Sequence, residues 1–225
     1  MSSSKTVLLT GFGPFPGVPR NASAALVRSL ALKADRVFGQ AAIVSAELPT
    51  VWREAPVMLE QLYFAHRPDI ALHFGVSHMA HAMTIECYAR NLAGRPDAAG
   101  DEPQLGLLTE YGPEELRVSI PTGRIVARLL RRGVPAVLSH DAGTYLCNAL
   151  LYHSLELMRT LEIGGRCGFV HVPVGLPRQS RPSMRQGSNV LTFDDAVEGG
   201  LEILATLMNR QRRRPGMAAS LSPMT

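Results

Sequence analysis

One cysteine stands where the sequence predicts the start of a helix. Residues 134–138 form a short apolar run typical of a buried strand, and Asp141-Ala-Gly143 has the composition of a turn. From Thr144, a candidate N-cap, leucines recur at helical spacing, so Cys147 falls in the predicted first turn. Free backbone N–H groups and the positive end of the helix dipole favour a thiolate there. Cys147 is therefore a candidate nucleophile, although most helical cysteines are ordinary apolar residues.

A nucleophilic cysteine needs a base, and the base needs a group that orients it. His171 ends the apolar run 167–171, and we expect it at the same rim of a sheet as Cys147. Glu86 stands in an otherwise apolar stretch, where a buried carboxylate requires a partner such as an imidazolium. The simpler alternatives are a hydrogen-bonded histidine at a strand end and an exposed strand glutamate, and the sequence leaves both open.

The elements that position these residues alternate between strands and helices. The predicted strands are 6–10, 41–48, 70–74, 134–138 and 167–172, with 83–90 as a further strand or hairpin arm. The predicted helices begin near Asn21, Pro56, Thr122, Thr144 and Thr192, the last with a capping box. Residues 91–112 are expected to form a long surface loop. This alternation predicts a three-layer α/β/α sandwich with a mostly parallel, mixed sheet covered by helices on both faces.

The length and charge of the chain limit its organisation and partners. Its 225 residues are enough for one large domain, which we place at residues 1–209. Four arginines between positions 210 and 214 account for the whole net charge of +4, so residues 210–225 are expected to be a basic, disordered tail. The balanced remainder argues against a nucleic-acid partner. No apolar run is long enough to cross a membrane, and no secretory signal opens the chain, so we expect a cytoplasmic protein.

Neither a cofactor nor a metal is expected. Residues 11–17 contain three glycines after the first predicted strand, but they do not match the dinucleotide fingerprint, and two prolines remove N–H donors. His78, His81 and Cys87 are loosely spaced and have no evident fourth ligand for a metal. Three cysteines in a chain of this length do not indicate a disulfide framework.

Four sequence blocks carry a family resemblance. They are Thr10-Gly-Phe-Gly-Pro-Phe15 with Asn21-Ala-Ser23, residues 74–80 with Thr84-Ile-Glu86, Asp141-Ala-Gly-Thr-Tyr-Leu-Cys-Asn148, and Gly168-Phe-Val-His-Val-Pro173. In this order and spacing they resemble the pyroglutamyl peptidase I family, also called pyrrolidone-carboxyl peptidases. The resemblance covers most of the chain up to about Pro173.

The resemblance implies a cysteine peptidase that removes N-terminal pyroglutamate from peptides without a cofactor. It implies that Cys147 is the nucleophile, that His171 is the general base and later acid, and that Glu86 orients His171. Members of the family occur as monomers and as tetramers, so a homo-oligomer remains open. The alternative is a catalytically weak or redirected relative that acts as a small-molecule or peptide binding protein or as an amidase.

The substrate ring is a neutral lactam, so its pocket should be apolar with a few backbone hydrogen bonds. The resemblance implies that Phe12, Phe15 and Tyr145 line this pocket. It also implies that the backbone of Val76 holds the lactam. Many bacterial members have an arginine about ten residues after the catalytic glutamate, near the oxyanion, and Arg95 stands one residue before that place.

Overall fold

The computed structural model describes residues 4–103, 106–178 and 190–209 of the chain. The strands are β1 (Thr6–Phe12), β2 (Ala42–Leu48), β3 (Ile70–Ser77), β4 (Met83–Glu86), β5 (Tyr88–Arg90), β6 (Glu115–Arg117), β7 (Ala136–Ser139) and β8 (Arg166–Pro173). The helices are α1 (Ala22–Val37), α2 (Ala55–His66), α3 (Thr122–Arg131), α4 (Leu146–Thr160) and α5 (Phe193–Leu207). The predicted basic tail lies outside the described residues.

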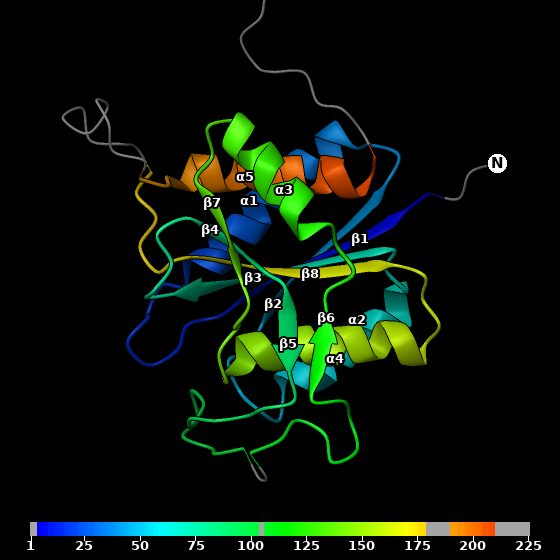
Figure 1. Ribbon diagram of the computed structural model, residues 1–225, viewed down its shortest axis with the longest axis vertical. Helices are drawn as coiled ribbons and strands as arrows, with labels where there is room; N and C mark the ends of the chain where they lie inside the picture. Colours follow the sequence, from blue (N-terminus) through cyan, green and yellow to red (C-terminus); the bar gives the residue numbers. More distant parts are fainter. Residues whose placement is uncertain (1–3, 104–105, 179–189, 210–225) are drawn as a thin grey trace, which may run out of the picture.

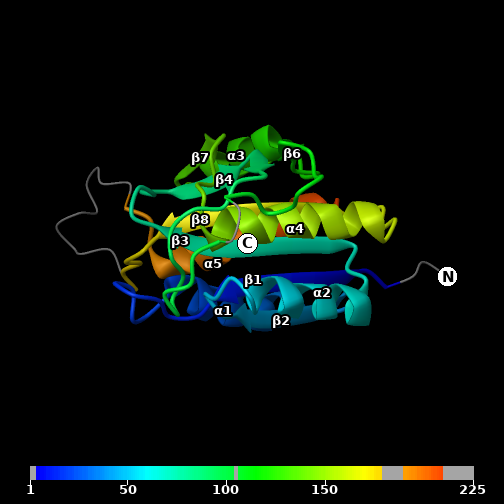
Figure 2. The same ribbon diagram turned by 90° about the horizontal axis from the view of Figure 1, so that it is seen from below.

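The main sheet has the strand order β2-β1-β3-β8-β4-β7. Helices α1, α3 and α5 cover one face, and α2 and α4 cover the other (Figures 1 and 2). Strands β2, β1, β3 and β8 are parallel, whereas β4 runs antiparallel to β8 and pairs in parallel with β7. The predicted α/β/α sandwich with a mostly parallel, mixed sheet is therefore confirmed. Within the described ranges, no helix combines the length and apolar character needed to cross a membrane.

The interior strands β1 and β3 are buried on both faces. Val7, Leu8 and Leu9 are fully buried, as expected for a continuous apolar run with a parallel strand on each side. Strand β3 continues three residues beyond the predicted 70–74, because its pairing with β8 extends to Ser77 opposite Pro173. This extension carries residues 75–77 to the rim where the site lies.

The prediction of a buried strand before Cys147 is wrong. Strand β7 is the last strand of the sheet, and Val137 and Leu138 are 49% and 43% exposed. A short apolar run bounded by turns looks the same in the centre and at the edge of a sheet. Because β7 is parallel to β4 and β4 is antiparallel to β8, β7 points away from the carboxyl end of β8. Residues 140–145 must therefore lead the chain back before α4 begins.

The stretch predicted as one strand or hairpin arm forms two strands in different sheets. Strand β4 belongs to the main sheet, whereas β5 pairs antiparallel with β6 beside α4 (Figure 1). No sequence pattern predicts β6, because three residues are too few to show a strand periodicity. The small sheet links the chain leaving Glu86 to the helix that carries Cys147.

Most predicted helix boundaries are confirmed. The Asn21 side chain caps α1 by accepting a hydrogen bond from the Ser23 N–H at 3.1 Å. Thr192 and Asp195 form the predicted capping box of α5. Gly133 follows α3 with φ of 78°, a conformation that glycine adopts without strain. These local signals each set one end of a helix on the face of the sheet that α1, α3 and α5 cover.

Candidate active site

The register of three neighbouring strands sets the geometry of the site. His171 lies opposite Gly75 in the parallel pair β3–β8 and opposite Thr84 in the antiparallel pair β4–β8. Residues opposite one another share a face of the sheet, and so does Glu86, two residues beyond Thr84. Helix α4 covers this face. The antiparallel insertion of β4 therefore brings the Glu86 side chain towards His171, beneath the helix that begins with Cys147.

Glu86 and His171 form a buried pair. The Glu86 Oε1 atom lies 2.8 Å from His171 Nδ1, and the two residues are 1% and 7% exposed. Burial disfavours the charged imidazole, but Cys147 and Glu86 outweigh it and raise the pKa of His171 to about 10. The histidine is therefore an imidazolium at neutral pH, and its Nδ1 is held by Glu86, which leaves Nε2 for other contacts.

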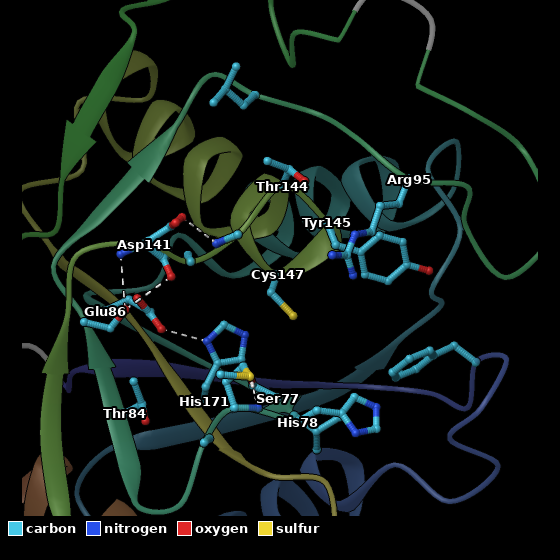
Figure 3. Close-up of a pocket in the computed structure, with 18 of the residues that line it drawn as sticks. Ser77, His78, Thr84, Glu86, Arg95, Asp141, Thr144, Tyr145, Cys147 and His171 are labelled. Carbon is cyan, nitrogen blue, oxygen red and sulfur yellow. Dashed lines mark hydrogen bonds and ion pairs between the residues drawn. The ribbon is translucent and has the colours of Figure 1, made fainter.

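Cys147 is the second residue of α4, and it is partly exposed. Its thiol lies beside the His171 ring and points into a cavity (Figure 3). Gly75 makes room for it, because a Cβ atom at this position would lie 2.8 Å from the Cys147 Sγ. A cysteine next to a histidine at a helix start is an arrangement that can attack a carbonyl carbon.

The start of α4 differs from the prediction. Thr144 is not the N-cap: Tyr145 is, with an extended backbone, and no side chain of the described residues caps the helix. The Thr144 carbonyl instead accepts a hydrogen bond from the Gly94 N–H at 2.7 Å, which ties this segment to the loop after β5. Without a side-chain cap, the first N–H groups of α4 can bind a developing oxyanion.

The cavity has a volume of about 870 Å³ and two chemically different ends. Phe15 and Tyr145 line one part, with their rings 6.2 Å apart, and Val76 also lines the cavity. Arg90 and Asp141 line another part and form an ion pair at 3.7 Å. In Figure 3, Asp141 and Tyr145 lie on opposite sides of Cys147. The reacting groups thus stand between an aromatic end and a polar end.

The structure brings most of the predicted site residues to this cavity. Its lining includes the residues Cys147, His171, Glu86, Phe15, Val76, Tyr145 and Arg95. Phe12 is different, since it is 2% exposed and packs in the hydrophobic core at the end of β1. A direct contact of Phe12 with a substrate ring therefore stays a prediction.

Asn148 is a positioning side chain that the sequence analysis did not single out. It is 1% exposed, and its Oδ1 accepts a hydrogen bond from the Arg90 N–H at 2.8 Å. Its Nδ2 donates to the carbonyls of Arg90 and Leu92 at 2.8 and 2.9 Å. The residue after Cys147 therefore binds the chain that leaves Glu86. The available signal was an amide side chain among the apolar residues that open the predicted helix.

A second cysteine–histidine cluster is chemically inert. Under α4, His73 contacts Thr10 Oγ1 through Nδ1 and Ser154 Oγ through Nε2, both at 2.7 Å, and Cys167 Sγ lies 3.1 Å from the same Ser154 hydroxyl. Burial lowers the pKa of His73 to about 3 and raises that of Cys167 to about 12. Both groups stay neutral, so Cys167 is a structural thiol and not a nucleophile.

Metal ligands are not grouped in the part of the chain that the structure describes, where no three His, Cys, Asp or Glu side chains could hold an ion. Cys87, one of the three residues considered from sequence, is buried, and its Sγ contacts Thr122 Oγ1 at 3.8 Å. His78 is exposed at the rim of the cavity.

Comparisons with known proteins point to one family. The family model described as Pyroglutamyl peptidase matches residues 5–210. A pyrrolidone-carboxylate peptidase of Ralstonia nicotianae is 35% identical over 209 residues, which cover 92% of this chain and 94% of the relative. The pyrrolidone-carboxylate peptidase of Bacillus velezensis is 35% identical over 178 residues, covering 78% of this chain and 81% of the relative.

Solved structures agree with these relatives. The crystal structure of pyroglutamyl peptidase I from Bacillus amyloliquefaciens matches with a TM-score of 0.77 at 33% identity, covering 91% of this chain and 96% of that one. A variant pyrrolidone carboxyl peptidase from Pyrococcus furiosus matches with a TM-score of 0.80 at 29% identity, covering 91% and 98%. The similarity therefore spans the sheet, its helices and the cavity.

Proposed function

The chain belongs to the pyroglutamyl peptidase family, and on this basis we propose that it removes N-terminal pyroglutamate from peptides as a cysteine peptidase. The observation that carries the proposal is the buried Glu86–His171 pair beside Cys147, between the aromatic and polar ends of one cavity. In this proposal Cys147 is the nucleophile, His171 is the acid and base, and Glu86 orients His171.

The first chemical step uses Cys147 as a thiolate and His171 as an imidazolium. The Cys147 thiolate attacks the carbonyl carbon of the pyroglutamyl residue and forms a C–S bond, while first-turn N–H groups of α4 donate hydrogen bonds to the oxyanion. Collapse of this intermediate breaks the C–N bond, and the His171 imidazolium gives its proton to the leaving amine. The products are the shortened peptide and an acyl-enzyme.

The second step restores the enzyme. His171, now neutral, takes a proton from a water molecule, whose oxygen attacks the thioester carbon. The C–S bond breaks and pyroglutamate leaves, so the thiolate and imidazolium are formed again. Throughout, the Glu86 carboxylate bound to Nδ1 stabilises the imidazolium and keeps Nε2 directed to the reacting groups.

The aromatic end of the cavity accounts for the choice of substrate. Phe15, Val76 and Tyr145 present apolar surface that suits the ring of a neutral lactam. A proline residue of similar size would bring a charged ammonium, whose removal from water is costly without a partner. We therefore infer that pyroglutamyl substrates are preferred over prolyl and glutaminyl ones.

Release of a fluorescent amine from pyroglutamyl, prolyl and glutaminyl amides, with and without a thiol alkylator, tests the proposal. The expected result is alkylator-sensitive release from the pyroglutamyl amide, which Cys147→Ser abolishes. Release from another amide only would keep the thiol mechanism and reject the lactam pocket. No release from any of the three, with a slowly alkylated Cys147, would favour a binding protein.

A further inference from the structure

Trp52 supports the aromatic end of the cavity from behind. It is the one tryptophan of the chain and lies in the connection between β2 and α2. Its indole meets the Tyr145 ring edge-on with centroids 5.8 Å apart, and Tyr145 in turn faces Phe15 at 6.2 Å. Three segments distant in sequence thus form one aromatic cluster, with the cavity-lining Tyr145 in the middle.

Trp52 also binds the loop that forms the neighbouring wall. Its indole Nε1–H donates to the Arg95 carbonyl at 3.1 Å, and its backbone N–H donates to Asp97 Oδ2 at 2.7 Å. Both Arg95 and Asp97 line the cavity. Arg95 has φ of 75°, a left-handed conformation that is costly for a residue with a Cβ atom. The indole N–H therefore holds the carbonyl of a strained residue in place.

Asp97 completes this attachment. It is 4% exposed, and its Oδ1 accepts hydrogen bonds from the N–H groups of Ala99 and Asp101 at 2.8 and 3.0 Å. The Ala98 N–H donates to the Thr50 carbonyl at 3.0 Å, next to the tryptophan segment. The wall from Arg95 to Ala99 is thus bound to the β2–α2 connection before any substrate arrives.

Trp52 makes these contacts although it is partly exposed and lies outside the cavity lining. We propose that Trp52 is a positioning residue for pyroglutamyl recognition, which holds the Tyr145 ring and the Arg95–Asp97 segment as a fixed wall around the lactam. The inference rests on the proposed function. Within the described part of the chain, Trp52 makes no hydrogen bond or ring contact with Cys147 or His171, so its loss should weaken substrate binding more than the chemical step.

Kinetics of two substitutions separate the contacts. Trp52→Phe keeps an aromatic ring against Tyr145 but removes the indole N–H, and loss of one hydrogen bond should raise KM for a pyroglutamyl amide about three- to tenfold. The value of kcat should stay within about twofold, because the reacting groups are untouched. Trp52→Ala removes both contacts and should raise KM further. Phe64→Ala is the matched control, since Phe64 is a 59% exposed aromatic of α2.

Two further measurements do not depend on turnover. Hydrogen exchange at the Ala98 and Ala99 amides should be faster in Trp52→Phe than in the wild type, because the acceptors of their hydrogen bonds lie in the two segments that Trp52 joins. In Cys147→Ala, the emission of the single tryptophan should shift when 2-pyrrolidone, a neutral lactam, fills the aromatic end.

The outcomes separate the two proposals. A wild-type protein that releases no amine refutes the proposed function. The hydrogen-exchange rates and the tryptophan emission still test the role of Trp52. A wild-type protein that releases amine, with unchanged KM and unchanged exchange in Trp52→Phe, overturns the role of Trp52. If Trp52→Ala does not fold, Trp52→Phe alone decides.

Discussion

Replacing Glu86 by glutamine removes the negative charge that lies beside His171 while preserving the shape of the Glu86 side chain. The glutamine Oε1 can still accept the 2.8 Å hydrogen bond from His171 Nδ1, between two groups that are at most 7% exposed, so the change removes the negative charge and keeps the contact. A hydrogen bond to a charged group contributes about 1–1.5 kcal/mol more than a neutral one, so we expect kcat/KM for a pyroglutamyl amide to fall roughly five- to tenfold. The carboxylate is also one cause of the raised pKa of His171, about 10, so its loss lowers that pKa.

The assay is the pH profile of kcat/KM for Glu86→Gln beside the wild type. In the proposed mechanism activity requires the imidazolium, so the alkaline limb marks the loss of the His171 proton, and it should move to lower pH in the variant. Glu60→Gln, at an exposed position of α2, is the control and should leave the profile unchanged. An alkaline limb that stays in place in Glu86→Gln, whatever the rate, would refute the assignment of Glu86 as the partner that stabilises the imidazolium.

Cys147→Ser should abolish turnover without lowering the thermal unfolding midpoint, because the thiol is partly exposed. One equivalent of alkylator should label the native protein at neutral pH, on Cys147 and not on buried Cys167, as peptide mass spectrometry would show. Gly75→Ala places a Cβ 2.8 Å from the Cys147 Sγ and should slow alkylation at least about tenfold. Burial opposes ionisation of Asp97, but backbone N–H donors outweigh it and lower the pKa of this carboxyl group. The ionised carboxylate therefore stabilises the wall fully at pH values above the ordinary aspartate pKa of about 3.9. That contribution is lost as the pH falls through the lowered pKa, and Trp52 emission should show a transition there that Asp97→Asn removes.

The parts of the fold that depend on local chemistry could be predicted from the sequence. The Asn21 cap, the Thr192–Asp195 capping box and the apolar run of β1 each act within a few residues and are confirmed. The position of β7 could not be predicted, because the order of strands depends on pairing between distant segments. The same limit applies to the direction of β4, which no local pattern of Met83–Glu86 reveals.

The candidate site shows the same division. Residue types and family blocks indicated Cys147, His171 and Glu86, and the structure places the three together. The predicted path of the chain from β7 to Cys147 was wrong, since β7 does not run parallel to β8. The loop after β7 returns the chain to the rim of the sheet. Trp52 could not be found from the sequence, because its role depends on contacts with residues 43 and 93 positions further along the chain.

The Ser154 hydroxyl, on the sheet-facing side of α4, fixes both the rotation of the helix about its axis and its position along that axis. Ser154 is seven residues, or about two turns, after Cys147, so both side chains leave the helix on the same side. Packed leucines would tolerate a small rotation or slide of the helix, but the hydrogen bond of Ser154 with His73 would not. Alignment of the thiol with its imidazole is thus set in part by a neutral polar contact two turns away. An apolar replacement of Ser154 could preserve the unfolding temperature and still leave the Cys147 thiol out of line with the His171 ring.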